Sequence, residues 1–397
     1  MKINLVFIRS DISSSNPFTD HQKNVFLDEL SKCEDIKLSE DGKTMFFIES
    51  GGTEEKFKKI YKSYKEPYVF VSTDANNSLP ATLEICSFLR KNNLTYKIIH
   101  DELKRLPMAI LHSKASSKVV LEKINQSNNL LKGHRLGVVG MPSDWLISSD
   151  VNYLKAKDVF GVELINVTFE EFKDLIDKKL PYEVNEDILE HANKIIPHDE
   201  VVKALYIYSA LKEIIRKYNL NGLTVRCFDL LGSVHATSCL ALALLNAEGI
   251  IATCEGDIPA MLSMDLIYKL THQSSFQANP SLIKEDEGYM YLAHCTLPLD
   301  MTTSFRYDTH FESGIGLGIK GELLESYVTI FKLSSTLEEF VILEGEIEKN
   351  LDIKSLCRSQ IKVRISEGIH SIESAPCGNH LIVFYGLHKL EFIKALK

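Results

Sequence analysis

The feature that most constrains the fold is a change of hydrophobic pattern near residue 285. Before this point, short apolar runs alternate with amphipathic stretches of helical period; after it, the pattern has a period of two residues and few helices. Short continuous apolar runs are typical of parallel strands buried on both faces, whereas a period of two is typical of antiparallel strands. The sequence therefore predicts parallel α/β structure first and antiparallel structure afterwards.

The apolar runs and helical patterns give the expected elements. In the first third, strands are expected at 2–8, 44–49, 68–72 and 96–99, with helices at 21–31, 54–63 and 80–91. A linking helix is expected at 113–133, followed by strands at 135–140, 162–167, 223–228 and 250–254 and helices at 169–178, 197–218 and 236–247. The last part predicts strands at 287–295, 325–333, 339–348, 361–365 and 381–385, and a terminal helix at 389–397.

The predicted fold class is α/β, with two Rossmann-like open parallel-sheet domains followed by a β-rich, barrel-like C-terminal domain. A chain of 397 residues exceeds the size at which a single hydrophobic core keeps growing, so several domains are expected. We place them at residues 1–132, 133–285 and 286–397, the second carrying the candidate catalytic glutamate.

Composition excludes several classes of protein. With 45% hydrophobic and 25% charged residues the chain is globular, and a net charge of -9 without clustered Lys and Arg argues against a nucleic-acid partner. No apolar stretch approaches the ~20 residues of a membrane-spanning helix, and the start of the chain is too short and β-like for a signal peptide, so a cytoplasmic protein is expected. The eight cysteines form no C-x-x-C pair, which disfavours a disulfide framework or a zinc knuckle.

Polar residues follow three of the apolar runs. Open α/β sheets bind ligands beyond the carboxyl ends of their strands, so such residues are candidates for a site. Arg226 follows one run, Glu255 and Asp257 follow the next, and His294 ends a run in the β-rich part. In extended geometry Glu255 and Asp257 share a face.

Each candidate also has a structural interpretation. Asp257 precedes a helical pattern, and capping that helix is the more common role for an Asp there, whereas Glu255 has no such capping role. Arg226 either orients substrate oxygens or forms a salt bridge with Asp229 or another acid. His380, at the start of an apolar strand, and His294 are each either a structural histidine or a ligand. A glutamate with one or two histidines would suit Mn²⁺, Co²⁺ or a related divalent ion.

Four segments together resemble the L-fucose isomerase and L-arabinose isomerase superfamily. The run Cys254-Glu255-Gly256-Asp257 is similar to the family's E-(A/G)-D segment, and Ala278-Asn279-Pro280 falls where the family has its second carboxylate. Ala293-His294-Cys295 resembles its histidine-containing strand, and Asn379-His380 its carboxy-terminal metal histidine. The order and spacing match over about residues 220 to 390.

The resemblance implies a metal site and roles for individual residues. Glu255 would be both metal ligand and acid/base, joined by His380 and by Asn279, with Mn²⁺ as the usual ion. His294 would be a fourth ligand, as in the arabinose branch, or a hydrogen-bonding residue, as in the fucose branch, which the neighbouring Cys295 favours. Arg226, His294 and Asn379 would bind substrate. The family also implies a homo-oligomer with active sites near subunit contacts.

The implied reaction is aldose–ketose isomerisation through an enediol. Asn279 departs from the family, because an amide oxygen can ligate a metal but cannot take up a proton. Either Asp257, a bound water or a hydroxyl then completes the proton transfer, or the substrate and reaction differ. Two alternatives remain open: an isomerase of an anionic sugar such as a sulfonated hexose, with Arg226, Arg306 or Lys320 meeting the anion, and a sugar-binding paralogue without turnover.

Overall fold

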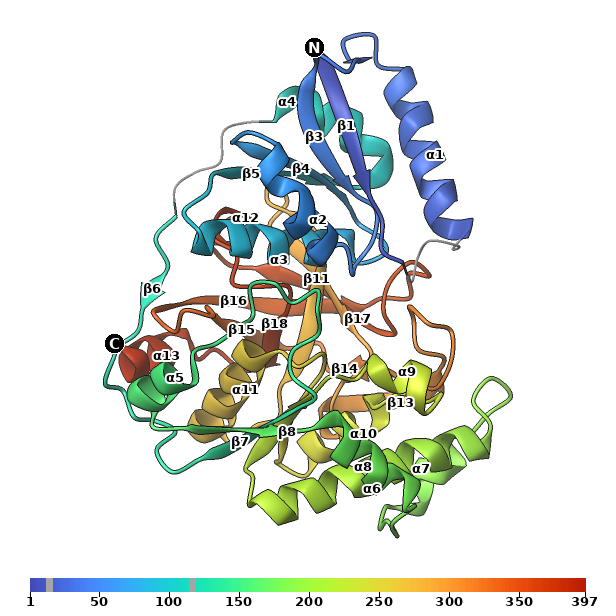
Figure 1. Ribbon diagram of the computed structural model, residues 1–397, viewed down its shortest axis with the longest axis vertical. Helices are drawn as coiled ribbons and strands as arrows, with labels where there is room; N and C mark the ends of the chain where they lie inside the picture. Colours follow the sequence, from blue (N-terminus) through green and yellow to red (C-terminus); the bar gives the residue numbers. More distant parts are fainter. Residues whose placement is uncertain (12–16, 114–118) are drawn as a thin grey trace.

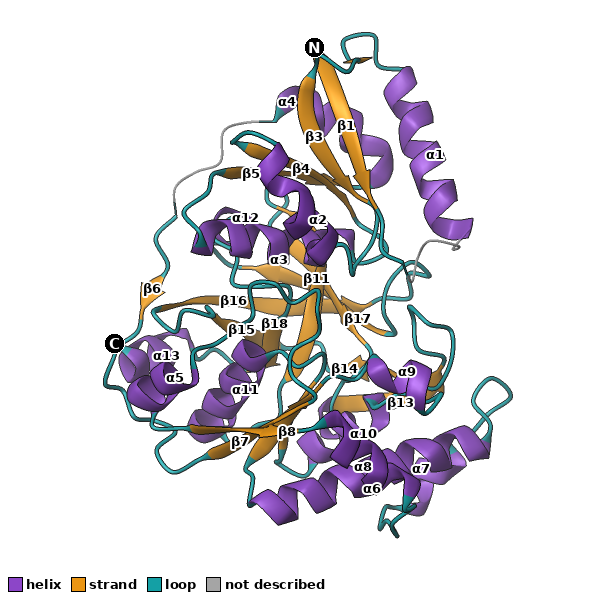
Figure 2. Cartoon of the chain, viewed as in Figure 1, coloured by secondary structure: helices purple, strands orange, loops and turns teal. Residues whose placement is uncertain are grey.

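The structure is a computed structural model that describes residues 1–11, 17–113 and 119–397. Three sheets follow one another along the long axis of the molecule (Figure 1). A parallel sheet with its helices lies at the amino-terminal end, a β-barrel lies in the middle, and a second parallel sheet with helices lies at the other end (Figure 2). A mixed α/β fold with parallel sheets and an antiparallel barrel is confirmed.

The first sheet has five parallel strands in the order β2-β1-β3-β4-β5. All six residues of the inner strand β4 are buried, as expected for a strand covered on both faces. The strands are β1 (Lys2–Ile8), β2 (Lys37–Leu38), β3 (Lys43–Ile48), β4 (Tyr68–Thr73) and β5 (Tyr96–Asp101), and the helices are α1 (Pro17–Ser31), α2 (Glu54–Ile60), α3 (Ser78–Lys91) and α4 (Leu106–His112).

The second sheet has four parallel strands in the order β10-β9-β7-β8. Its strands are β7 (Arg135–Val139), β8 (Glu163–Val167), β9 (Gly222–Val225) and β10 (Ile251–Thr253). Its helices are α5 (Tyr153–Phe160), α6 (Phe169–Asp177), α7 (Glu186–Glu190), α8 (His198–Tyr218), α9 (Asp229–Ser233), α10 (Cys239–Ala247) and α11 (Ile258–Thr271). Every strand expected for the two parallel sheets is present within one or two residues of its expected bounds, apart from the carboxyl end of 223–228.

The barrel is a closed ring of six antiparallel strands. Its order is β15-β18-β11-β12-β17-β16, and pairing of β15 with β16 closes it. The strands are β11 (Phe276–Lys284), β12 (Tyr289–His294), β15 (Tyr327–Leu333), β16 (Glu339–Asn350), β17 (Ser359–Ile365) and β18 (Leu381–Tyr385). A separate hairpin, β13 (Thr302–Asp308) with β14 (Gly318–Leu323), and helices α12 (Ser371–Ser374) and α13 (Lys389–Leu396) complete this part.

Strand β11 was not expected from the sequence. Its middle contains Pro280, and proline removes a ladder hydrogen bond, which argues against a central strand. In the structure, the register between β11 and β12 shifts between Pro280 and Leu282, so the proline sits at a β-bulge. The barrel thus takes a strand from before residue 286, while the division of the chain into domains stays a prediction.

The expected linking helix at 113–133 is wrong where it can be compared. Residues 114–118 lie outside the described part of the chain, and residues 119–133 form no helix. Instead the short strand β6 (Glu122–Lys123) pairs with β16 at the edge of the barrel. The run Val119-Val120-Leu121 before it and the Ser127-Asn128-Asn129 turn after it favour extended and turn structure over helix.

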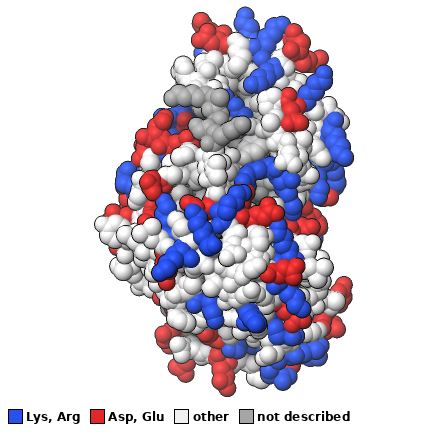
Figure 3. Space-filling view, turned by 90° about the vertical axis from the view of Figure 1, so that its left-hand side faces the viewer, with Lys and Arg blue, Asp and Glu red and all other residues white. Residues whose placement is uncertain are grey.

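The barrel and the second parallel sheet share their hydrophobic core. One buried cluster contains Val139 and Leu223 of that sheet together with Met290 and Val383 of the barrel. The first sheet has two clusters of its own, around Phe26 and Phe57. On the face drawn in Figure 3, acidic and basic side chains are intermingled. None of the helices in the described ranges has the length and apolar character needed to cross a membrane.

Candidate active site

One pocket lies where the three parts of the chain meet. Its wall comes from the loops that follow β1, β3 and β4 in the first sheet, the loops that follow β7, β9 and β10 in the second, and three segments of the carboxy-terminal part. Both parallel sheets therefore direct the carboxyl ends of their strands at the same pocket, the usual place for ligands in such sheets. Its lining residues are Ser10, Gly51, Gly52, Glu54, Asn77, Pro80, Ala81, Trp145, Phe228, Glu255, Asn279, Glu312 and Asn379.

Glu255 is held at the end of β10 by an unusual backbone. Glu255 and Gly256 both have positive φ, 65° and 73°. A Cβ on Gly256 would lie 2.6 Å from the carbonyl oxygen of Met141, so only glycine fits beside the loop after β7. That same loop carries Trp145, whose Nε1 donates a hydrogen bond of 2.7 Å to Oε2 of Glu255. The two loops together fix the direction of the carboxylate.

His380 is held by a buried chain of charges. Its Nδ1 is 2.8 Å from Oδ2 of Asp257, which also accepts a 2.8 Å hydrogen bond from Nζ of Lys332. The other oxygen of Asp257 accepts from the backbone N–H of Ala260 and so caps α11. Asp257 therefore has both roles considered for it: it caps the helix, and it joins the charged side chains of the site.

The orientation of His380 leaves its second ring nitrogen facing Glu255. Nε2 of His380 is 3.5 Å from Oε1 of Glu255, and the rings of His380 and His294 have centroids 5.3 Å apart. A histidine whose Nδ1 bonds a carboxylate while Nε2 points into a site is the usual arrangement of a metal-ligating imidazole. The structure thus brings Glu255, Asp257, His294 and His380 into one cluster.

The ionisation of this cluster follows from its partners. Burial opposes the charge on Asp257, but Lys332 and His380 outweigh it and hold the pKa of the carboxyl well below its ordinary value. Burial likewise opposes the charge on His380, yet Glu255 and Asp257 raise its pKa to about 9. The positive charge of His380 in turn overcomes burial at Glu255 and lowers the pKa of that carboxyl. Glu255 is therefore ionised at neutral pH.

Glu255 and His380 are spaced like two ligands of one divalent cation, and Asn279 lines the same pocket as Glu255. Two ligand atoms that each lie ~2.1 Å from one ion at an angle of ~90° to ~110° are ~3.0 to ~3.4 Å apart, close to the 3.5 Å between Glu255 and His380. Among the described residues, Nε2 of His380 and Oδ1 of Asn279 are buried without a hydrogen-bond partner. Buried polar atoms are rarely left in this state unless something else binds them.

Cys254, Glu255 and His294 also lie close enough to share an ion, since one ligand atom from each falls within 4.8 Å of the others. His294 Nδ1 is 2.9 Å from Oγ1 of Thr296, which leaves its Nε2 for a ligand. Burial lowers the pKa of His294 to about 3, so its ring is neutral, as a metal ligand must be. The contact with Cys227 and burial raise the pKa of Cys254 well above its usual value, so its neutral thiol is a poor ligand.

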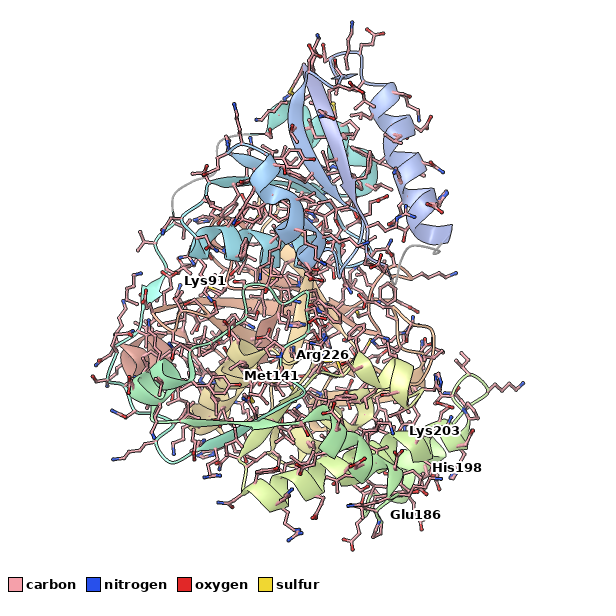
Figure 4. All side chains as sticks on the ribbon, viewed as in Figure 1. Lys91, Met141, Glu186, His198, Lys203 and Arg226 are labelled. Atoms are coloured by element: carbon pink, nitrogen blue, oxygen red, sulfur yellow. The ribbon has the colours of Figure 1, made fainter. Side chains whose placement is uncertain are left out.

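The guanidinium of Arg226 forms salt bridges with two acidic side chains. It is 2.7 Å from Asp144 and 2.9 Å from Asp229, and it also donates to the carbonyl of Pro142. This is the salt-bridge interpretation of Arg226. Figure 4 labels it near the middle of the molecule, yet it is not among the residues that line the pocket.

The other two cations considered for an anionic substrate lie on the β13–β14 hairpin. Arg306 and Lys320 are directly opposite each other in that ladder, and Lys320 is paired with Asp352 at 2.5 Å. Across the described part of the chain, the pocket lining contains no Lys or Arg.

Several pocket residues were missed by the sequence analysis. Trp145 is the single tryptophan of the chain and follows a predicted strand, a signal that could have singled it out. Glu54 and Asn77 stand at expected helix starts, where acids and asparagine are common for structural reasons. Glu312 carries no such positional signal. Neither does Lys332, which lies outside the pocket lining and was missed as the partner of Asp257. Asn379, expected to bind substrate, lines the pocket with its Oδ1 buried and unpartnered among the described residues.

Comparisons with known proteins point to one kind of enzyme. No protein-family model matches the chain. It is similar to the sulfoquinovose isomerases of Priestia aryabhattai and Priestia megaterium, each 23% identical over 351 residues, which is 83% of this chain and 77% of the relative. The sulfoquinovose isomerase of Alkalicoccus urumqiensis is 23% identical over 342 residues, covering 82% of this chain and 74% of the relative.

Proposed function

We propose that the protein is a metal-dependent aldose–ketose isomerase that acts on an open-chain sugar. The observation that carries the proposal is the pairing of Glu255 with His380 at 3.5 Å. Glu255 lines the pocket together with Asn279, whose Oδ1 is buried without a hydrogen-bond partner among the described residues. Two further facts support it: several relatives are sulfoquinovose isomerases, and the fold has the architecture implied by the resemblance to L-fucose and L-arabinose isomerases.

Glu255, His380 and Asn279 would hold the ion, with His294 as a further ligand. A divalent ion such as Mn²⁺ supplies a Lewis acid that polarises the oxygens on C1 and C2 and stabilises charge on an enediolate. Because the folded protein protonates His380, binding of the ion would release that proton. Asp257 and Lys332 act through His380: they fix its ring and direct Nε2 into the site.

Glu255 would carry the proton from C2 to C1, while a bound water or a hydroxyl would move the second proton from O2 to O1. It is ionised at neutral pH and almost fully buried, so it can accept a proton away from bulk water. Trp145 keeps the carboxylate directed into the pocket through its hydrogen bond to Oε2. Both oxygens of Asp257 are already bonded within the protein, so we assign it a positioning role and not a second proton transfer.

A sulfonated sugar is the second candidate substrate, and the names of the relatives favour it. The lining of the pocket does not, because within the described residues it offers acids and amides but no cation. The same enzyme chemistry applies to either sugar, so the choice rests on a direct substrate comparison.

The test is a ketose-forming screen with L-fucose, L-arabinose, D-glucose and sulfoquinovose. Purified protein loaded with Mn²⁺ should convert at least one of them, and chelation should abolish the conversion until Mn²⁺ is restored. Binding of a sugar without any ketose would indicate a sugar-binding paralogue and reject the isomerase. Activity that survives exhaustive chelation would reject the metal. Light scattering on the same preparation tests the expected homo-oligomer.

A further inference from the structure

Part of the pocket lining comes from the first parallel sheet and from the β13–β14 loop. Glu54 begins α2 after β3, Asn77 precedes α3 after β4, and Glu312 reaches the pocket from the β13–β14 loop. We call these three residues the acceptor wall. None of them is used by the isomerase chemistry described above, and each is a polar side chain at the surface of the pocket.

Asn77 stands where a helix cap is expected and does not act as one. Its backbone is left-handed, with φ of 55°, and its side chain makes no capping hydrogen bond to α3. Instead Nδ2 donates to Oε1 of Glu312 at 2.5 Å. That bond turns Oδ1 away from Glu312, and Oδ1 has no hydrogen-bond partner in the described ranges although Asn77 is only 7% exposed. Capping therefore does not explain this asparagine.

Glu54 likewise carries a buried oxygen that no described residue hydrogen-bonds. It is 2% exposed, and its Oε2 is buried with no hydrogen-bond partner among residues 1–11, 17–113 and 119–397. Burial, followed by the charges of Glu84, Glu255 and Glu312, raises the pKa of Glu54 well above its ordinary value. Burial and the charge of Glu255 raise the pKa of Glu312 to about 7. Both carboxyls therefore lie near Glu255 in the same pocket.

The unpartnered atoms define the ligand chemistry. Oε2 of Glu54 and Oδ1 of Asn77 are oxygens, as are Oδ1 of Asn279 and Asn379 across the pocket. Leaving a buried acceptor without a donor costs roughly 1 to 3 kcal/mol, so a ligand that donates hydrogen bonds to these oxygens removes that cost. A hydroxyl group brings one donor and accepts as well, so a row of hydroxyl groups can bond both the amide oxygens and a carboxyl in either protonation state.

We propose that the acceptor wall binds hydroxyl groups of an uncharged polyol segment, so that Glu54, Asn77 and Glu312 determine which sugars enter. The identification of that polyol as the non-reacting part of the isomerised sugar rests on the proposed function. Glu255 and His380 then face the reacting carbons, and an anionic substituent, where a sugar has one, lies away from the wall.

The test uses alditols, which are open-chain polyols that cannot be isomerised. Titration calorimetry measures D-glucitol and L-fucitol binding to the full-length protein loaded with Mn²⁺. Glu54→Gln and Asn77→Gly should each weaken the better-bound alditol at least ~10-fold, the scale of a lost hydrogen bond to a buried carboxyl or amide, and Glu312→Gln should weaken it less. Affinity for Mn²⁺ should stay within ~2-fold, since the wall is not expected to hold the ion.

Two variants serve as matched controls. Glu55→Gln changes the next residue of α2, which pairs with Lys59 outside the pocket lining, and Asn93→Gly changes an exposed asparagine with the same left-handed backbone as Asn77. Both should leave alditol binding unchanged. The proposal would be overturned if the wild-type protein bound neither alditol at 10 mM. It would also be overturned if the variants of the acceptor wall bound the alditol as well as the two controls do. Weakened alditol binding without ketose formation from any sugar would instead reject the isomerase and keep the wall.

Discussion

The two sides of the pocket differ in how their polar groups are satisfied. On the metal side, Asp257 has both oxygens hydrogen-bonded, to Ala260, Lys332 and His380, and Glu255 is tied to Trp145. On the acceptor wall, buried oxygens of Glu54 and Asn77 have no partner within the described residues. The saturated carboxylate of Asp257 holds His380 in one geometry. The unpartnered atoms differ in role: among the described residues, Nε2 of His380 and Oδ1 of Asn279 are the atoms assigned to the ion, whereas those of the wall are left for a ligand. We therefore distinguish the residues that carry out the reaction from the residues that select the sugar.

The largest expected effect lies on the metal side. Glu255→Gln keeps the shape of the side chain but removes the proton acceptor, so kcat for the best sugar should fall at least ~10²-fold. Glu54→Gln should mainly raise KM and change kcat much less, because it removes binding to a part of the sugar that does not react. Steady-state kinetics on both variants measures this contrast. Equal losses of kcat in the two variants would remove the distinction between the two sides.

A second effect concerns the buried charges that position His380. Lys332 and Asp257 are both 0% exposed and 2.8 Å apart. Lys332→Met leaves Asp257 without its ammonium partner in the interior, so the free energy of unfolding should fall by about 3 kcal/mol, as is typical when one partner of a buried pair is removed. Chemical denaturation measures it. Lys173→Met, which breaks the exposed pair with Asp177, is the control and should show no measurable change. A loss no greater than that of the control would contradict the role given to Lys332.

The smallest effect comes from Glu84 of α3, whose hydrogen-bond partners among the described residues are Ser148 and Ser149 and include no cation. Its Oε1 accepts from the backbone N–H groups of Ser148 and Ser149 at 2.6 and 3.1 Å, yet burial raises its pKa to about 7. A raised pKa favours the protonated carboxyl in the folded state. That stability is present below the unfolded pKa of ~4.5 and is lost as pH rises through about 7.

Glu84→Gln removes this titration while its amide oxygen can still accept both N–H bonds. Between pH 5 and pH 8, the wild-type protein should therefore lose about 2 kcal/mol of unfolding free energy relative to the variant. Denaturation curves at the two pH values measure the difference. Parallel pH profiles for the two proteins would show that Glu84 ionises normally in the fold.

The fold could be predicted from the sequence wherever a pattern had one physical meaning. Apolar runs such as Tyr68–Thr73 are buried on both faces and form strands as expected. Strand β11 was missed because Pro280 argues against a central strand, and only the pairing partner β12 shows that a bulge accommodates it. The linking helix was wrong although Val119-Val120-Leu121 and Ser127-Asn128-Asn129 favour extended and turn structure locally. That the segment adds a short strand to a distant barrel is visible only from its partner β16.

The residues of the candidate site could also be predicted only in part. Glu255 and His380 could be proposed because strand ends and the family resemblance both pointed to them, although 124 intervening residues separate them in the sequence. Glu54 and Asn77 could not, since an acid in a first helical turn and an asparagine before a helix are explained by helix stability alone. Only the structure shows that Asn77 does not cap its helix and that both residues face the pocket of Glu255.

Proton transfer by Glu255 is tested most directly by isomerisation in D₂O. The protein loaded with Mn²⁺ is incubated with its best aldose, and the ketose is examined by NMR for deuterium at C1, with the recovered aldose examined at C2. A carboxylate that carries the proton through an enediol exchanges it with solvent in at least part of the turnovers, so deuterium should appear at both positions. Glu255→Gln should lose exchange and ketose formation together. Ketose that forms without any deuterium, or exchange that continues in Glu255→Gln, would contradict the role of Glu255.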